Sequence, residues 1–228
     1  MNKTYSKLFI AIFISFLFLS VNAQHKGEIR SFSVIIDGDT LYGYRVGNDT
    51  IIEPRYSWAE KFHDGLAVVR DVKTGKYGYI NMENEIVIPF LYDEAVAFGE
   101  QRLGGKGFNN LALVNIGIPE AQHFSYDGKW GLINKKGEEV LPIKYEDILG
   151  ISDGAAFIFE GDIIRHDIGN DFYIEERGKY GLIDINGKMI VPPIYDEVIF
   201  LNGATLVKND GKVFEINRKG EVIRTIVE

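Results

Sequence analysis

Beyond its first 30 residues, the chain alternates short apolar runs with turns rich in glycine and asparagine. Four aromatic–glycine pairs stand out, each followed by a tight turn and a β-branched run. These pairs are Tyr42-Gly43, Tyr77-Gly78, Trp130-Gly131 and Tyr180-Gly181. A proline stands 11 residues after the glycine in every case, as Pro54, Pro89, Pro142 and Pro192. Identical spacing with matching flanks predicts a repeated structural unit.

The pattern predicts three strands in each unit: one before the aromatic–glycine strand, that strand itself, and one after it. Runs such as 66–69 and 205–207 precede it. Turns such as Asn186-Gly187 tolerate positive φ and connect antiparallel neighbours. Proline lacks a backbone donor and is expected to end the third strand. A tyrosine with two acidic residues, such as Tyr195-Asp196-Glu197, should form a short fourth strand or a turn into the next unit.

Alternation along the aromatic strand predicts how the units pack. Tyr77 and Tyr79 point to one side of the sheet, while Gly78 and Ile80 point to the other. Because both sides are apolar, each sheet should be covered on both faces, and glycine should lie where a neighbouring backbone or ring leaves no room for a Cβ. Helix-period stretches are nearly absent. We therefore expect an all-β fold of stacked antiparallel units with three to four strands each.

The segment Lys129-Trp130-Gly131-Leu132-Ile133 resembles the motif of the WG-repeat family of bacterial proteins, and the Lys-Tyr-Gly triplets at 76–78 and 179–181 are close variants. The resemblance extends from about Ser33 to the end of the chain. It implies a β-strand repeat with no shared enzymatic activity. About five units can be traced, and the first and last depart from the pattern. Arg45 replaces an apolar residue in the first, and Val213-Phe214 replaces the aromatic–glycine pair in the last, so these units resemble caps.

Five units could form an open, curved, solenoid-like array or close into a small β-propeller. The atypical terminal units favour the open form. Pairing or packing of the Ser33–Ile36 strand with the segment 212–225 would instead indicate a closed ring.

The first 23 residues have the features of a cleaved signal peptide. Lys3 and Lys7 precede an apolar run of 12 residues, Leu8–Leu19, which is too short to span a membrane as a helix. Small residues then predict cleavage between Ala23 and Gln24; an uncleaved anchor is the alternative. This predicts a secreted or periplasmic protein with a single mature domain, residues 24–228, and no membrane span after cleavage.

The net charge argues against two classes of partner, and the absence of cysteine excludes disulfides as a source of stability. Removing residues 1–23 takes away two lysines and moves the net charge from −8 to −10. Such a balance argues against binding to nucleic acid or anionic lipid. The chain has no cysteine, so its stability rests on packing without disulfides.

No motif predicts catalysis, a metal or a cofactor. The acidic pairs suggest a glycan hydrolase, which uses two carboxylates, but adjacent strand residues point to opposite faces and the pairs recur with the repeat. The histidines lack partners at metal-ligand spacing. The segment Gly104–Gly107 lacks the spacing of a phosphate-binding loop. We therefore expect a protein that is not an enzyme.

Two insertions interrupt the repeat, near residues 115–127 and 161–176. Insertions in repeat proteins map to loops, and loops on rigid scaffolds often carry function. The candidate binding residues lie within these insertions, outside the repeat phase. They are His123, Tyr126, His166, Phe172 and Tyr173.

The leading hypothesis is an exported, non-enzymatic binding or protein-interaction module with a protein or glycan partner. A structural component of the cell envelope is the second hypothesis, and an enzyme of unrecognised type is the third. The identity of the partner and the oligomeric state stay open at this point.

Overall fold

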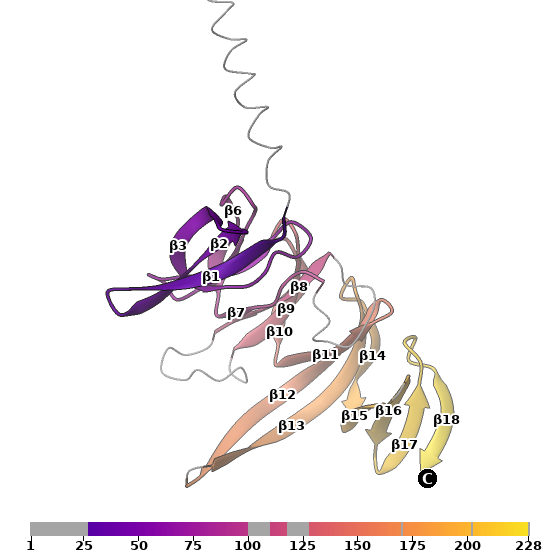
Figure 1. Cartoon of the computed structure of the whole chain (residues 1–228). Coiled ribbons are helices and arrows are strands. Elements are labelled where there is room, and N and C mark those ends of the chain that lie inside the picture. Colours follow the sequence, from indigo (N-terminus) through magenta and orange to yellow (C-terminus); the bar gives the residue numbers. More distant parts are fainter. Residues whose placement is uncertain (1–26, 100–109, 118–127, 170, 202, 228) are drawn as a thin grey trace, which may run out of the picture.

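The computed structural model describes residues 27–99, 110–117, 128–169, 171–201 and 203–227. These residues form 18 β-strands in four antiparallel sheets, and this part of the chain contains no helix (Figure 1). It therefore contains no helical segment of the length and apolarity needed to cross a membrane. The predicted all-β class is confirmed.

The strands follow one another along the chain within each sheet. The six-stranded first sheet contains β1 (Ile29–Ile36), β2 (Asp39–Val46), β3 (Asp49–Ala59), β4 (Ala67–Asp71), β5 (Tyr77–Ile80) and β6 (Ile86–Tyr92). The second contains β7 (Glu94–Ala95), β8 (Leu111–Ile116), β9 (Lys129–Asn134) and β10 (Glu139–Tyr145). The third contains β11 (Asp147–Ser152), β12 (Ala155–Ile168), β13 (Asp171–Asp184) and β14 (Met189–Tyr195). The last contains β15 (Glu197–Leu201), β16 (Ala204–Asn209), β17 (Lys212–Ile216) and β18 (Val222–Val227).

The acidic residues that follow the repeat tyrosines begin the next sheet. Residues after Tyr92, Tyr145 and Tyr195 open β7, β11 and β15, so these segments are short fourth strands, one of the two predicted alternatives. In the first repeat, Tyr56 lies within β3, which pairs with β2 through its first part and with β4 through its second. The first two units therefore share one six-stranded sheet.

Proline does not end the third strand, contrary to the prediction. Pro142 lies in the middle of β10, at a register shift: Leu132 pairs with Leu141 and Trp130 with Tyr145. Between these pairs one residue of β9, Gly131, thus faces three of β10, and the extra residues form a bulge. A bulge tolerates proline because the ladder hydrogen bonds are already interrupted there.

This bulge explains the repeat glycine. A Cβ built on Gly131 would lie 2.7 Å from the Leu141 carbonyl oxygen and 2.8 Å from the Ile143 Cα. Gly43, Gly78 and Gly181 face the corresponding third-strand backbone in their own units. The predicted close approach of a backbone is confirmed, and it comes from the same unit.

Successive sheets bury apolar side chains between them. Along β8, Ala112 and Val114 join the core shared with the first sheet, whereas Leu113 joins the core shared with the third. Along β12, Ile158 and Phe159 divide in the same way between two cores. Each internal sheet is therefore covered on both faces, as the alternation predicted.

The turns between the aromatic strand and the third strand link consecutive units. A Cβ on Gly137 would lie 3.3 Å from Ile88 of the preceding unit, and one on Gly187 would lie 3.2 Å from Leu141. Asn84 occupies the same turn position in the second unit, where the Tyr56 hydroxyl donates a 2.6 Å hydrogen bond to its side-chain oxygen. Each turn thus packs on the third strand of the unit before it.

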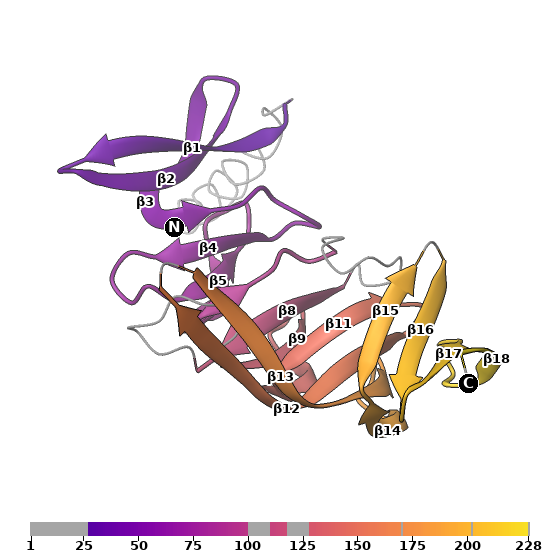
Figure 2. The same ribbon diagram turned by 90° about the horizontal axis from the view of Figure 1, so that it is seen from below.

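The array is open. β1 pairs with β2 alone, and β18 pairs with β17 alone. The N-terminal and C-terminal sheets lie at opposite ends of the molecule in two perpendicular views (Figures 1 and 2). The strand 33–36 and the segment 212–225 do not pair, which confirms the expected open form over the closed propeller.

Candidate functional site

The third sheet carries a projecting hairpin. β12 and β13 pair continuously from Ala155↔Asp184 to Ile168↔Asp171. Their outer neighbours are shorter, because β11 pairs with β12 only as far as Phe159 and β14 pairs with β13 only from Tyr180 onward. Residues 161–169 and 171–178, here called the arm, therefore form a two-stranded ribbon that extends beyond the sheet (Figure 1). The predicted loop insertion at 161–176 is thus a continuation of two strands.

A pair of glycines lies at the base of the arm. Gly161 and Gly178 are directly opposite each other, and a Cβ on Gly161 would lie 2.5 Å from the Gly178 Cα. Only glycine allows two strands to approach so closely. The close approach marks the point where the ribbon leaves the four-stranded sheet.

One face of the arm carries a cluster around His166. The His166 ring stacks on Tyr173, its cross-strand partner, with ring centroids 4.6 Å apart and an angle of 10° between the ring planes. His166 Nε2 lies 2.7 Å from Glu175 Oε2, and Arg177 Nε donates a 2.7 Å hydrogen bond to Glu175 Oε1. Glu175 therefore joins a histidine and an arginine on one exposed surface.

The opposite face carries a cation–π contact. The Arg165 guanidinium lies over the Phe172 ring, 4.2 Å from its centroid, and Arg165 Nε donates a 2.7 Å hydrogen bond to Asp167. Nearer the sheet, the Tyr180 hydroxyl lies 2.5 Å from Glu176. Both faces of the arm thus present an aromatic ring beside charged groups.

The charges on the arm stabilise one another. Hydrogen bonds from Arg177, and then from His166, hold the pKa of Glu175 below its usual range. The same carboxylate raises the pKa of Arg177. Burial, followed by the hydrogen bond with Glu176, raises the pKa of Tyr180. This arrangement suits recognition by hydrogen bonding, ion pairing and stacking.

An open groove of about 460 Å³ lies at the base of the arm. One wall is the β12 segment Gly161–Ile164. The other comes from the ends of β8 and β9, which contribute Ile116, Gly117, Gly128 and Lys129, together with Glu146. The groove therefore lies between the second sheet and the arm.

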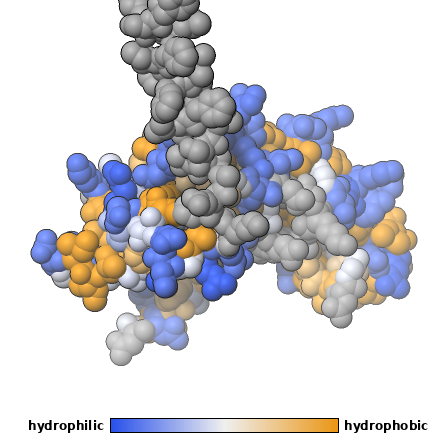
Figure 3. Space-filling view, turned by 45° about the horizontal axis from the view of Figure 1, so that its top comes forward, coloured by the Kyte–Doolittle hydropathy of each residue, from blue (hydrophilic) through white to orange (hydrophobic). Residues whose placement is uncertain are grey.

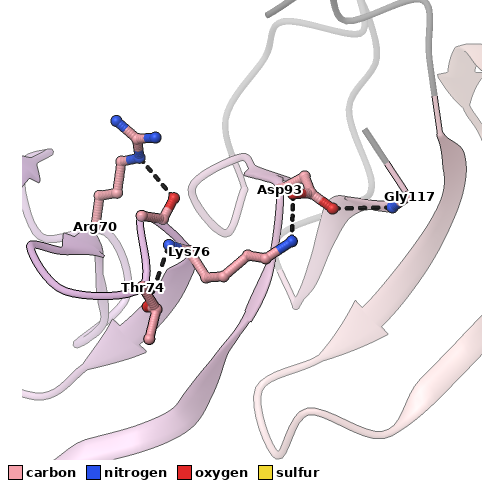
Figure 4. Close-up of polar contacts among 6 residues, drawn as sticks. Arg70, Thr74, Lys76, Asp93 and Gly117 are labelled. Atoms are coloured by element: carbon pink, nitrogen blue, oxygen red, sulfur yellow. Dashed lines mark hydrogen bonds and ion pairs between the residues drawn. The ribbon is translucent and has the colours of Figure 1, made fainter. Parts of the chain in front are cut away.

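The recurring acidic residues have a structural role. The lysine before the aromatic–glycine pair binds the first acidic residue after the repeat tyrosine in three units, as Lys76–Asp93, Lys129–Glu146 and Lys179–Asp196. Figure 4 shows Asp93 accepting from Lys76 and, through its second oxygen, from the Gly117 amide at 2.9 Å. This pairing accounts for the recurrence of the acidic pairs with the repeat.

The structure places three of the five predicted site residues on the arm, but only His166 and Tyr173 are in contact, because Phe172 lies on the opposite face. His166, Phe172 and Tyr173 lie on the arm, with Tyr173 half exposed. His123 and Tyr126 lie outside the described residues. Sequence reasoning missed Arg165, Glu175 and Arg177, because residues 163–168 and 172–177 lack the alternation of polar and apolar residues that would have indicated a strand. Among the described residues, no cluster of three acidic or histidine side chains could hold a metal ion.

Among the comparisons with known proteins, the family model of the repeat gives a clearer result than any individual protein or structure. No curated protein matches the chain. Among solved structures, apo AztD from Citrobacter koseri is 11% identical with a TM-score of 0.27, and the similarity covers 81% of this chain and 62% of AztD. A second structure of Citrobacter koseri AztD is 11% identical with a TM-score of 0.25, covering 88% of this chain and 66% of that one. The chain thus spans less than two thirds of the length of AztD.

The WG-containing repeat gives the clearer result. Its family model matches residues 48–74, 77–102, 130–162 and 180–212, which together make up just over half of the chain. The last match ends as β17 begins, so the aromatic-position strand and the third strand of the atypical fifth unit, β17 and β18, lie beyond the matched segments. The chain therefore belongs to the WG-containing repeat family.

Proposed function

We propose that this chain is an exported, non-enzymatic interaction module that binds another protein through its arm. The arm is the observation that carries the proposal: a two-stranded ribbon projects from a stacked scaffold and exposes aromatic and charged side chains on both faces. The features of residues 1–23 support export.

The shape and chemistry of the arm favour a protein over a glycan. A projecting ribbon can enter a groove on a partner, whereas small ligands favour concave pockets. Tyrosine and arginine are the residue types that dominate protein interfaces, and here both are held by neighbours before any partner arrives. Pre-ordered side chains lose less conformational entropy on binding.

Photocrosslinking in the producing cell tests this proposal. A photoreactive benzoylphenylalanine replaces Tyr173, and the control carries it at Lys136, an exposed position in the turn between β9 and β10. We expect a discrete crosslinked protein from position 173 and none from position 136. The same product from both positions, or from neither, overturns the arm as the binding site.

N-terminal sequencing of the protein recovered outside the cytoplasm tests the export. We expect a mature chain that begins at Gln24. A chain that retains Met1 and stays in the cytoplasm contradicts this part of the proposal.

A structural role in an envelope assembly is the second candidate, and the terminal edge strands favour it. Ile35 and Ile36 of β1 are exposed at one end of the array, as are Ile223 and Val227 of β18 at the other. Figure 3 shows apolar patches toward the left and the right of the face that it draws. Exposed edge strands can pair with other chains. Sedimentation of the purified protein separates the two roles, because a structural role through these edges requires concentration-dependent oligomers.

A further inference from the structure

The groove at the base of the arm follows the edge of a strand. Four consecutive residues of β12, Gly161, Asp162, Ile163 and Ile164, line it. Side chains alternate between the two faces of a strand, so a groove that contacts four consecutive residues borders the strand edge, where the backbone groups lie. The groove therefore gives access to the backbone of β12.

This edge of β12 has no partner strand in the described part of the chain. β11 pairs with β12 as far as Phe159, and from Glu160 outward the pairing is with β13 alone. A strand edge without a partner exposes alternate N–H and C=O groups that can hydrogen-bond to an added strand. The opposite wall, formed by Ile116, Gly117, Gly128 and Lys129, borders the space that such a strand would occupy.

The side chains of β12 specify which strand fits. Asp162 and Ile164 line the groove from one face, which the exposed Glu160 shares just outside it, whereas Gly161 and Ile163 share the other face. Asp162 also lies opposite Arg177 of β13. Residues directly opposite each other on paired strands share a face, and opposite charges there are favourable. Across the groove, Lys129 is already bound to Glu146. A strand alternating basic and apolar residues therefore matches both faces of this edge.

We propose that the β12 edge binds an extended segment of a partner protein by strand addition, and that this segment alternates basic and apolar residues. The inference rests on the proposed function and names the class of partner segment. Backbone hydrogen bonds would supply most of the affinity, and the two faces of β12 would select the side chains. The net charge of −10 without residues 1–23 favours approach of a basic segment.

Peptide binding to the purified chain provides the first test. The probe is a fluorescent octapeptide of alternating lysine and valine, and its control has the same composition arranged as two blocks, which cannot match both faces. We expect the alternating peptide to bind about tenfold more tightly, since only its side chains are in phase with the edge. Equal affinity for the two peptides overturns the proposal.

The charge of the edge provides the second test. Asp162→Asn should weaken binding of the alternating peptide by up to about fivefold, the usual range for an exposed pair. Asp49→Asn, an equal change at an exposed position in the first sheet, should leave binding unchanged. An equal effect of both variants would show that net charge alone attracts the peptide, and would overturn the assignment to β12.

Disulfide mapping locates the peptide. Because the chain has no cysteine, Ile163→Cys introduces a single thiol at the groove. We expect disulfides with peptides in which cysteine replaces a valine, and few with those in which it replaces a lysine. Crosslinking without this alternation, or equal crosslinking from Thr225→Cys on β18, overturns strand addition here. If photocrosslinks from position 173 persist while these peptide tests fail, only this inference falls and the arm remains the binding site.

Discussion

The fourth and the last repeat units differ in the residue that stands at the glycine position of the aromatic strand. In the fourth unit, Gly181 faces a bulge in β14, so that Tyr180 pairs with Tyr195 and Leu182 with Val191. In the last unit, Phe214 stands at that position and pairs with Thr225, and β18 follows β17 with single-residue register shifts. The aromatic strand can therefore form without glycine. Glycine is required only where the bulge of the third strand lies directly against the aromatic strand.

The two units also differ in the contacts that the third strand makes. The bulge in β14 brings Tyr195 beside Tyr180 and Asp196 to Lys179. β18 has neither contact, and all of its side chains are exposed. Phe214 instead packs against the core between the last two sheets. The glycine and the proline therefore serve to connect one sheet to the next.

Adding a methyl group to an internal repeat glycine should have the largest effect. Gly131→Ala places a Cβ within 2.8 Å of backbone atoms of β10, which must then move. We expect a loss of about 3 kcal/mol in the free energy of unfolding, measured by urea denaturation. Gly181→Ala is the matched variant and should cost less, because its contacts are 3.0 Å or longer. The reverse order would contradict the bulge explanation.

Placing the repeat glycine in the last unit should destabilise the protein instead of restoring the pattern. Phe214→Gly removes a partly buried ring from the core beside Ile216 and adds backbone freedom to β17. We expect a loss of about 2 kcal/mol in urea denaturation. An unchanged or increased stability would show that glycine favours this strand in its own right.

The hydrogen bond between the first two units should contribute a smaller amount. Tyr56→Phe removes the bond to Asn84, and we expect a loss of about 1 kcal/mol. Asn84→Gly is the matched variant, because glycine accepts the φ of 62° at this position and the last unit has Gly220 there. The double variant should lose less than the sum of the two single changes, and strict additivity would rule out the coupling.

Two acidic residues in different units, at the first and the second position after the repeat tyrosine, should have small effects of opposite sign on the free energy of unfolding. The Lys179 hydrogen bond lowers the pKa of Asp196, so this carboxylate stabilises the fold above its ordinary titration range and loses that contribution as the pH falls through the lowered pKa. Burial raises the pKa of Asp147, so its charged form is unfavourable above that raised pKa. Asp196→Asn should therefore destabilise the protein at pH 7, whereas Asp147→Asn should stabilise it by less than about 1 kcal/mol. Both differences should vanish in acid when thermal unfolding is followed against pH, and equal signs at pH 7 would contradict this account.

The sequence predicted the features that depend on local pattern. Turn residues such as Asn186-Gly187 and the alternation of Tyr77 to Ile80 were sufficient to predict the repeat and the stacked sheets, and the atypical terminal units predicted the open array. The bulge at Pro142 was missed because proline usually ends a strand, and only the fold of β10 over Gly131 accommodates it.

The candidate site was only partly predictable. His166, Phe172 and Tyr173 were recognised because they lie outside the repeat phase. The arm itself was not, since its many charged residues are typical of a loop and the strands there gain little from burial in a core. The contacts of Glu175 with His166 and Arg177 depend on the register between β12 and β13, which cross-strand pairing sets and the sequence does not state.

The turn that packs on the preceding third strand also bears on how such a protein can change in length over evolution. Gly137 packs against Ile88, and Gly187 packs against Leu141. The third strand of each unit therefore presents the next unit with the same kind of packing surface that its own turn contacts on the unit before. A duplicated unit would meet a surface that already fits it, and a deleted unit would leave matching neighbours behind. Whole units can therefore be gained or lost without redesigning the core, while the arm on the third sheet is free to diverge.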